Sequence, residues 1–294
     1  MDWDDAKYFL AIARNGQMLG AARALGVSQA MLSRRVAALE EACGTRLLHR
    51  STQGCKLTDD GKIMFGAAER VEAEMLAAAA EMQGRAGISG TVRIGAPDGF
   101  GSAFLAPRLH LIKTAYPDLH LQLVPAPRSF SLSQREADVA VMIGRPERGR
   151  LQVRRLTDYS LSLYASRSYL QERPAPERVD DLRHHPLVGY VEDLIFNDEL
   201  AYNADILKDW RSSIEVSTAI GQVEAVRGGG GIGLLHDFIA AGHDDLVRVL
   251  PDQRIVRTYW TAWHETMRGV RAMQAVTERL HDMVRGTPGL FVPD

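Results

Sequence analysis

The first 58 residues alternate apolar helical patterns with glycine breaks. Apolar positions at helical spacing predict a first helix, and these are Tyr8, Phe9, Ile12 and Ala13. A short helix over about residues 20–25 ends at Gly26, because glycine takes the left-handed conformation that stops a helix. Ser28 is a good N-cap for a longer helix, which stops before Gly44 and runs on Met31, Leu32, Val36 and Leu39.

The stretch TRLLHRSTQGCKLT, residues 45–58, follows the longer helix. It predicts a short strand, a turn at Gln53–Gly54 and a returning strand, which together form a small β-wing. A helix of about three turns, presented by a short helix across a glycine turn, has the size that enters a DNA major groove. The pattern therefore indicates a small DNA-binding domain over residues 1–58.

One long helical pattern covers residues 59 to about 86, and Thr58 and Asp59 can cap it. Its apolar seam repeats at spacings of 4, 3, 4, 3 and 4 through Met64, Ala68, Val71, Met75, Ala78 and Met82. Such a helix spans about 40 Å, too far for a small domain to cover. We therefore expect a dimerisation helix, with a hinge at GRAGISG, over a linker region of residues 59–89. The alternative is a long core helix packed within its own chain.

Residues 90–294 alternate strand and helix patterns. Near-continuous apolar strands such as TVRIGA, DVAVMIG and GIGLL, separated by helices, predict mostly parallel sheets covered on both faces. About 200 residues are many for one sheet, so two doubly wound sub-domains around a cleft fit better. We place sub-domain I at about 90–163 and 267–294, and sub-domain II at about 164–266. The predicted fold class is a winged helix-turn-helix, a linker helix and this α/β domain.

Ligands in such α/β folds bind at the carboxyl ends of strands. The candidate loops are residues 97–102, 127–131, 144–148 and 217–221. The candidate ligand-binding residues, with Tyr190 added, are Asp98, Phe100, Gly101, Ser102, Arg128, Ser129, Phe130, Gly144, Arg145, Ser217 and Thr218.

Composition changes this picture in only one place. The 46% apolar and 24% charged residues are ordinary for a globular protein, and the formal net charge is −2. Residues 21–58, however, carry six Lys or Arg side chains against two Glu, a local excess of four positive charges. This local excess is typical of a surface that binds nucleic acid.

Other chain-wide features indicate the compartment. We expect no membrane association, because no apolar run approaches the roughly 18 residues that a membrane span needs. The acidic start MDWDDAKYFL does not resemble a secretory signal, so we expect a cytoplasmic protein. Cys43 and Cys55 have no disulfide or zinc spacing and are interpreted as reduced thiols, with a redox switch as the alternative.

The predicted recognition helix carries residues suited to DNA. Gln29 can bind adenine through two hydrogen bonds, and Met31 offers an apolar surface to a thymine methyl group. Ser33, Arg34 and Arg35 lie a turn further on, where phosphates flank the groove. The full predicted DNA-binding set adds the cap and the wing, and comprises Ser28, Gln29, Ala30, Met31, Ser33, Arg34, Arg35, Arg50, Ser51, Thr52, Gln53 and Lys56.

Residues 1–90 resemble the winged helix-turn-helix and linker helix of the LysR-type transcriptional regulators. The matching run is YFLAIARNGQMLGAARALGVSQAMLSRRVAALEEACGTRLLHRSTQGCKLTDDG. Further on, SGTVRIGAP, READVAVMIG and VRGGGGIGLLHDFIA are similar to segments of the family's effector domain. The resemblance implies a bacterial regulator whose C-terminal domain is like type 2 periplasmic binding proteins. It also implies tetramers built as pairs of dimers, and a small effector between the sub-domains that alters binding to promoter DNA.

Two positions depart from the family pattern. Ala30 stands where many members have proline, and alanine should preserve the helix. Asp98 stands near the point where many members use Ser or Thr to hold a ligand carboxylate. A carboxylate there opposes an anionic ligand unless it is turned away or paired, for example with Arg128 or Arg145. An amine-bearing or neutral effector therefore stays open beside an anionic one, and we expect Ser102 and Arg128 to line the pocket.

Catalysis is not indicated. No Ser/His/Asp or Cys/His set has a supporting motif, and we expect no metal and no cofactor. The glycine run 228–231 lacks the Gly-Lys-Ser/Thr that a phosphate loop needs, so it is interpreted as a close-packed turn. Two alternatives to a regulator stay open. One is a solute-binding protein or ligand-sensing module without DNA regulation, and the other is an enzyme with an added regulatory module.

Overall fold

The chain divides into two compact units in a computed structural model. The first comprises Met1–Gly87, Ser133–Arg135 and His264–Arg271, and the second comprises Ile88–Leu132, Glu136–Trp263 and Ala272–Asp294. We call them the N-terminal and the C-terminal unit. The structure describes residues 2–51, 54–83, 88–126, 128, 130, 132, 136–146, 149–195, 197–267 and 269–293, with the side chains of 70, 73, 74, 76, 77 and 79–83 left out.

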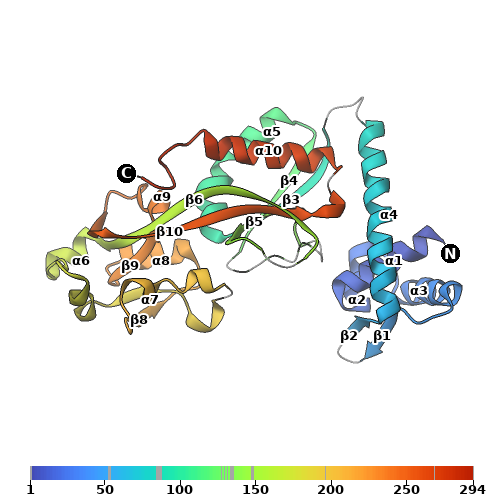
Figure 1. The fold of residues 1–294 in the computed structure, drawn as a ribbon, viewed down its shortest axis with the longest axis horizontal. Coiled ribbons are helices and arrows are strands. Elements are labelled where there is room, and N and C mark those ends of the chain that lie inside the picture. The colour runs from blue at the N-terminus through green and yellow to red at the C-terminus, as the bar shows by residue number, and fades with distance from the viewer. Residues whose placement is uncertain are drawn as a thin grey trace. The chain divides into compact units, whose positions relative to one another are not determined.

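Helices and a two-stranded wing make up the N-terminal unit (Figure 1), as the sequence predicts. The elements in order are α1 Trp3–Asn15, α2 Met18–Leu25, α3 Gln29–Cys43, β1 Leu48–Ser51, β2 Gly54–Leu57 and α4 Asp59–Gln83. Gly26 ends α2 with φ +65°, in the left-handed region, and the hydroxyl of Ser28 accepts a hydrogen bond from the amide of Met31 at 3.2 Å. Both predicted caps are therefore confirmed.

One apolar cluster holds the helices and the wing together. It contains the buried residues Phe9, Ile12, Ala21, Ala22, Leu32, Val36, Leu39, Leu47 and Leu48. The two wing strands pair antiparallel, with Leu48 opposite Leu57. Leu47 and Leu48 lie at the start of the wing and are buried in this cluster. Their burial fixes the wing to the helices, while backbone hydrogen bonds hold its two strands together.

The predicted seam of α4 divides into two parts. Met64 packs partly buried against the apolar cluster, and Ala68 is buried with Ala6 and Leu10 of α1. Further along, Val71 and Met75 are 46% and 58% exposed. Ala78 is exposed as well, and the side chain of Met82 lies outside the described residues. The start of the helix is thus core within its own chain, whereas the next turns present apolar side chains outward.

An ion pair also fixes the start of α4. The Arg14 guanidinium of α1 lies 3.3 Å from a carboxylate oxygen of Glu69 and 2.7 Å from one of Glu72. The side chains of Arg14 and Glu69 are 11% and 6% exposed, so little water screens the pair. The end of α4 at Gln83 is close to the predicted end at about 86, and residues 84–87 lie outside the described part of the chain.

An eight-stranded sheet forms the centre of the C-terminal unit. Its order is β4-β3-β5-β10-β6-β9-β7-β8. The bounds are β3 Gly90–Ala96, β4 Leu119–Pro125, β5 Val139–Ile143, β6 Leu151–Ser166, β7 Leu187–Gly189, β8 Ser212–Glu215, β9 Ile232–His236 and β10 Leu246–His264. We call β3, β4 and β5 the first half of the sheet and β7, β8 and β9 the second half.

The sheet is mixed, because it keeps the predicted parallel pairing within each half and adds two long antiparallel strands. Strands pair in parallel within each half, as β3 does with β4 and β5, and β7 with β8 and β9. The long strands β6 and β10 lie between the halves and pair antiparallel with β9 and β5. Both strands run on from one half toward the other (Figure 1), so the two predicted sub-domains share them as connecting strands.

Helices cover the faces of this sheet. They are α5 Leu109–Ala115, α6 Arg167–Glu172, α7 Asn203–Ile206, α8 Ala219–Arg227, α9 Asp237–Ala240 and α10 Arg271–Arg285. Single turns occur at Phe100–Leu105 (η1), Ala106–Arg108 (η2), Val179–His184 (η3), Glu192–Leu194 (η4), Asp198–Leu200 (η5) and Glu265–Met267 (η6). A π-helical turn and a 3-10 turn precede α5, so no continuous α-helix covers residues 100–115. Pro107 accounts for the break, because proline lacks the N–H that a continuous helix needs.

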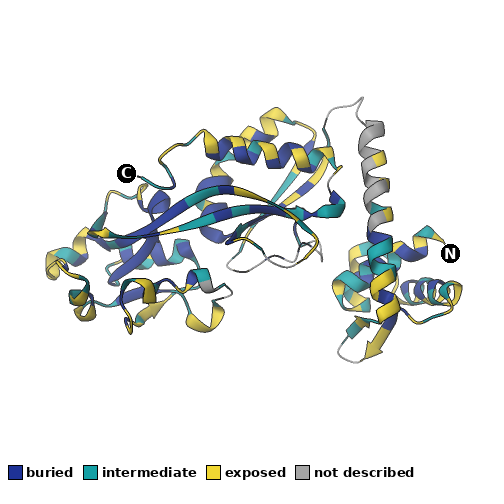
Figure 2. Ribbon diagram, viewed as in Figure 1, coloured by how far each residue is buried: buried dark blue, intermediate teal, exposed yellow. Residues whose placement is uncertain are grey.

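The core of the C-terminal unit joins segments far apart in the sequence. Phe100 and Phe104 pack against Tyr259 and Phe291, and α10 buries Val276 in the same cluster. The amide of Ser160 in β6 donates to the carbonyl of Phe291 at 2.8 Å. Figure 2 shows this buried layer along β6, β10 and the inner side of α10. Among the described residues, no helix combines the length and the apolar character that a membrane crossing requires.

Candidate functional site

The outer face of α3 gathers most of the residues predicted to contact DNA. Ser28, Gln29, Ala30 and Arg34 are exposed, and Met31 and Ser33 are half-buried. The opposite face carries Leu32, Val36 and Leu39, each 0% exposed. The helical period of about 3.6 residues separates the two sets, so burial of one face leaves the other on the surface.

The two adjacent arginines differ in their surroundings. Arg35 lies against α1, where its guanidinium is 3.2 Å from Asp5 and 3.8 Å from Asp2 and stands 5.9 Å from the centre of the Tyr8 ring. Arg34 is exposed, and within the described residues it forms no ion pair. The charge of Arg34 is therefore available at the surface, whereas that of Arg35 is balanced within the unit.

Glu40 connects the recognition helix to the wing, a role that sequence reasoning did not assign to it. One carboxylate oxygen accepts hydrogen bonds from the amides of Leu47 and Leu48 at 2.9 and 3.1 Å. The other lies 3.5 Å from Arg50, which also donates to the hydroxyl of Ser33 at 3.1 Å. Arg50 thus stands between wing and helix and holds the two parts of the surface in register.

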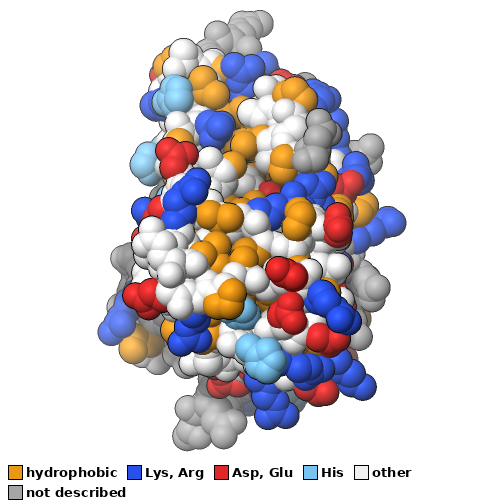
Figure 3. Space-filling model, turned by 90° about the vertical axis from the view of Figure 1, so that its left-hand side faces the viewer, with side chains coloured by type: hydrophobic (Ala, Val, Ile, Leu, Met, Phe, Trp, Pro, Cys, Tyr) orange, Lys and Arg blue, Asp and Glu red, His pale blue; other side chains and the backbone are white. Residues whose placement is uncertain are grey.

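The rest of the predicted wing set is only partly described. Ser51 donates to the carbonyl of Gly54 at 3.2 Å, and Lys56 is exposed. Thr52 and Gln53 lie outside the described residues. By contrast, the face of the C-terminal unit in Figure 3 carries Lys and Arg interspersed with Asp and Glu around apolar side chains. The mixed charges on that face do not form a uniformly basic surface.

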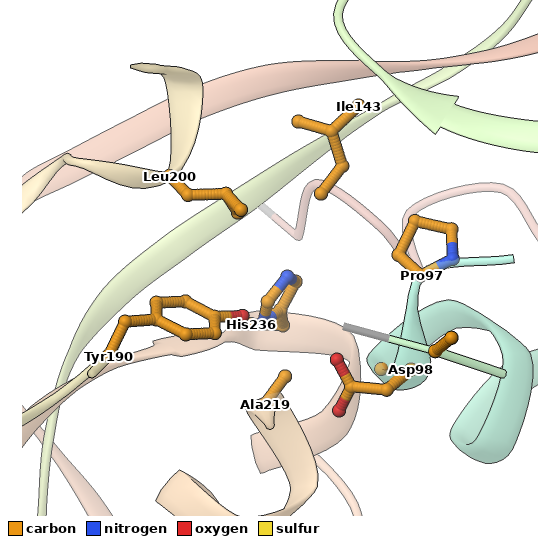
Figure 4. Close-up of a pocket in the computed structure, with 9 residues that line it drawn as sticks. Pro97, Asp98, Ile143, Tyr190, Leu200, Ala219 and His236 are labelled. Carbon is orange, nitrogen blue, oxygen red and sulfur yellow. The ribbon is translucent and has the colours of Figure 1, made fainter. Parts of the chain in front are cut away.

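A small cavity lies in the C-terminal unit between the two halves of the sheet (Figure 4). It is lined by Pro97, Asp98, Gly99, Ala126, Ile143, Tyr190, Leu200, Ala219 and His236. Its volume is about 10 Å³, which is close to the smallest space that holds one water molecule. Of the predicted ligand-binding residues, the structure brings Asp98 and Tyr190 together here.

Several other predicted residues lie outside this cavity. Phe100 and Gly101 are buried on η1, and Ser102 of the same turn is exposed because the neighbouring residues take the core positions. Ser102 does not line this cavity, so its place in the effector pocket stays a prediction. Thr218 caps α8, its hydroxyl accepting from the amide of Gly221 at 3.1 Å, and Ser217 before it is half-buried.

The two predicted arginines also have other surroundings. Arg128 lies 2.8 Å from Glu136 and stacks over the Phe130 ring, with its side chain 52% exposed. Arg145 stacks over Trp260 and lines a separate open groove of about 580 Å³. Gly144 precedes Arg145 after β5, and Ser129 lies outside the described residues. Neither arginine lines the cavity, so the suggested pairing with Asp98 is replaced by local contacts.

His236, Leu200 and Ile143 line the cavity and were not predicted. His236 is the last residue of β9, so the rule that ligands bind at carboxyl ends of strands could have identified it. Leu200 comes from the short turn η5, and no sequence signal marks it. The run 228–231 forms the turn between α8 and β9, in agreement with the interpretation as a turn.

Burial sets the charges around the cavity. It raises the pKa of Asp98, although backbone amides at Ile220, Ala219 and Gly99 oppose that shift. It lowers the pKa of His236 to about 4, so the imidazole is neutral at neutral pH. The pKa values of the Tyr190 and Tyr202 phenols are raised well above 10, also by burial. The lining thus offers a carboxyl group among neutral polar groups.

A second buried polar cluster centres on Asp237, beside the cavity residue His236. Its carboxylate is 1% exposed and accepts hydrogen bonds from the hydroxyls of Ser160, Ser162 and Tyr164, the last two at 3.2 and 2.9 Å. Arg254 of β10 lies 3.9 Å away. The cluster joins β6, β10 and the start of α9. The described residues contain no group of three or more His, Cys, Asp or Glu placed to hold a metal ion.

A helix-turn-helix unit with an exposed recognition helix, together with an α/β unit that encloses a polar cleft, defines a ligand-responsive DNA-binding protein. Residues 3–62 match the model of the bacterial regulatory helix-turn-helix proteins of the lysR family, and residues 85–285 match the LysR substrate binding domain. The chain therefore belongs to the LysR family of transcriptional regulators. Both matched models are regulator domains, so the alternatives of a solute-binding protein and of an enzyme have no support.

Similar proteins agree with this assignment. A transcriptional regulator of Xanthomonas campestris pv. campestris is 30% identical over 185 residues, which are 63% of this chain and 54% of that protein. The regulator CrgA of Neisseria meningitidis serogroup C is 27% identical over 262 residues, 87% of each chain. The structure of ArgP from Mycobacterium tuberculosis superposes with a TM-score of 0.73 at 21% identity, covering 97% of this chain and 98% of that one, which shows a shared fold.

Proposed function

We propose that this regulator binds double-stranded promoter DNA with the exposed face of α3 in the major groove and the wing on the adjacent backbone. The observation that carries this proposal is the separation of α3 into a fully buried face and a polar outer face that starts at Gln29. Gln29 and Met31 are the residues for base edges, and Arg34 is the residue for phosphate. Arg50 positions the wing against α3 and adds positive charge at its edge.

Mobility-shift titrations on the upstream DNA of the protein's own gene test this proposal. Gln29→Ala should reduce the preference for the specific site over competitor DNA, because a side chain bonded to a base carries about 1–3 kcal/mol of discrimination. Arg34→Ala should weaken all sites alike and lower the slope of log K against log salt by about 1. Arg211→Ala in the C-terminal unit removes the same charge from an exposed position and should leave both quantities unchanged. The reverse pattern would overturn the assigned roles.

For the C-terminal unit we propose that the effector binds in the cleft around Asp98, Tyr190 and His236. The sub-domains would then be about 90–163 with 267–294, and about 164–266, preceded by a DNA-binding domain over 1–58 and a linker over 59–89. The present cavity of about 10 Å³ admits no metabolite, so binding requires the two halves of the sheet to move apart. A screen of small neutral and amine-bearing metabolites by thermal shift identifies ligands that bind the folded chain.

We further propose that α4 mediates dimerisation, that dimers pair into tetramers, and that the protein acts in the cytoplasm, where the chromosome lies. Support for the first part comes from Val71 and Met75, which are 46% and 58% exposed on a helix whose earlier seam residues are buried. Val71→Asp with Met75→Asp should reduce the molecular mass measured by light scattering. Lys62→Asp on the charged edge of α4 is the control, and an unchanged mass in the double variant would reject this interface.

A further inference from the structure

Asp98 lies where two segments of the C-terminal unit meet. It follows β3 of the first half of the sheet, and its carboxylate accepts a hydrogen bond from the amide of Ile220 in α8 at 3.3 Å. The amides of Ala219 and Gly99 also favour the charged form of this carboxylate. Figure 4 shows the carboxylate directed toward Ala219. One side chain therefore links the loop after β3 to α8 of the second half.

The amide that Asp98 accepts from is a free donor at the start of a helix. The first amides of a helix have no partner within it and carry a partial positive charge, which attracts an anion. In α8 the hydroxyl of Thr218 accepts from the amide of Gly221, and Asp98 accepts from the amide of Ile220 just before it. The carboxylate is 8% exposed. The position at which α8 would bind an anionic ligand is thus filled by the protein itself.

The loop that carries Asp98 packs closely against α8 and α9, so the cleft is closed at this point. A Cβ placed on Gly99 would lie 3.1 Å from both the Ala219 Cβ and the Ile239 Cδ1, so the loop after β3 approaches α8 and α9 closely. The Tyr159 ring stacks on His236, which lines the cavity, at 5.3 Å between ring centres. Aromatic and aliphatic side chains therefore pack around the Asp98 carboxylate and keep it from solvent.

We propose that Asp98 is a built-in substitute for an effector carboxylate and the residue that determines effector charge. This inference rests on the proposed function of the cleft and adds the chemical class of the effector that binds there. The effector leaves the start of α8 to Asp98 and is neutral or amine-bearing. A second carboxylate brought to the start of α8 would face Asp98 at close range and be repelled. Removal of the Asp98 carboxylate should therefore turn α8 into a site for a small external anion.

Formate titrations of the full-length chain test this inference, because Asp98→Ala removes a group of the size of formate. Thermal unfolding of the variant is followed with sodium formate and with sodium chloride at equal ionic strength. At a formate concentration about tenfold above the dissociation constant, the melting temperature of the variant should rise by about 2–4 °C over the chloride control. The unmodified protein should show no such difference. If Asp98→Ala does not fold, Asp98→Ser, whose hydroxyl can accept one amide, is titrated in its place.

Asp181→Ala is the matched control. Asp181 also accepts hydrogen bonds from backbone amides at a helix start, those of Arg178 and Glu177, but it lies on the surface away from the cavity. Formate should not stabilise this variant more than chloride does. An equal formate response in the unmodified protein, or none in either Asp98 variant, would overturn the inference.

A mobility shift with formate present separates this inference from the proposed function. Stabilisation of Asp98→Ala by formate without any change in its DNA complex supports the anion site and counts against an effector role for the cleft. DNA binding by a folded Asp98→Ala variant that ignores formate leaves the DNA-binding proposal standing and rejects the role of Asp98.

Discussion

The N-terminal and C-terminal units place their polar functional side chains in opposite environments. The recognition face of α3 is exposed, and its chemistry depends on side chains such as Gln29 and Arg34 that water surrounds. In the C-terminal unit Asp98, His236 and Asp237 are 8%, 3% and 1% exposed. DNA is a large polyanion that a surface can meet directly, whereas a small ligand must be enclosed before a few polar groups can select it.

The two units should therefore respond differently to substitution. Under the proposed roles, a change at Gln29 or Arg34 should alter DNA binding and leave the fold intact, because both residues are exposed. A change at a buried polar group of the C-terminal unit alters the fold, because a removed partner leaves a desolvated group unsatisfied.

Asp237→Ala should cost about 3–5 kcal/mol of unfolding free energy. It leaves the hydroxyls of Ser162 and Tyr164 without this acceptor, removes one of the two acceptors of Ser160, and takes the carboxylate away from Arg254. Urea unfolding followed by circular dichroism measures the loss. Asp252→Ala removes an exposed carboxylate from β10 and should change the free energy by less than about 0.5 kcal/mol. Similar losses in both variants would mean that burial does not distinguish them.

Leu32→Ala should cost the N-terminal unit about 3–4 kcal/mol, because Leu32 is 0% exposed at the centre of its cluster and the substitution leaves a cavity. Met31→Ala, one position earlier and half-buried, should cost less than half as much. Thermal unfolding of the two variants gives the comparison. DNA binding should be lost in the first through unfolding and weakened in the second through the missing contact.

Acid should destabilise the C-terminal unit through His236. Its folded pKa of about 4 lies below the unfolded value of about 6.5, so the unfolded state binds more protons between those values. Stability therefore falls as pH drops from about 6.5 to 4, by about 3 kcal/mol from this group, and its contribution is constant below pH 4. His236→Asn should show a shallower pH dependence in urea unfolding. Parallel curves for the two proteins would contradict this assignment.

The arginine pair gives the smallest effect. Arg35→Ala should lower the unfolding free energy by about 0.5–1 kcal/mol, because its partly exposed guanidinium pairs with Asp5. Arg34→Ala should leave stability within about 0.5 kcal/mol while reducing the salt dependence of DNA binding. Chemical unfolding and salt titration on the same two variants provide the test. A larger reduction of the salt slope by Arg35→Ala would reverse the distinction between them.

The N-terminal unit could be predicted from the sequence because its signals are local. Ser28 caps α3 three residues before the amide it accepts from, and Gly26 ends α2 through its own backbone conformation. Tertiary contacts explain what was missed. Arg35 pairs with Asp5, 30 positions away, and Glu40 accepts from the amides of residues 7 and 8 positions away. The periodicity of the sequence does not show which of two adjacent arginines pairs with an acid.

The cleft could be predicted only in outline. The rule that ligands bind at the carboxyl ends of strands identified Asp98 and the start of α8 as candidates, and it could have identified His236. It could not show that the Asp98 carboxylate reaches Ile220, a residue 122 positions away, or that Ser102 would face solvent on a π-helical turn. Likewise, β6 and β10 are 16 and 19 residues long, and this length comes from their place between the two halves of the sheet rather than from a local pattern.

The contact between Ser160 and Phe291 has a consequence for the order of events during synthesis. The four helices and the wing of the N-terminal unit lie within the first 83 residues, whereas the β6–Phe291 contact and the packing of α10 require residues some 200 positions later. At about 5–20 residues per second, a ribosome needs roughly 10–40 s to add that length. During translation, the nascent chain can therefore present a folded recognition helix well before the domain that senses the ligand is able to close.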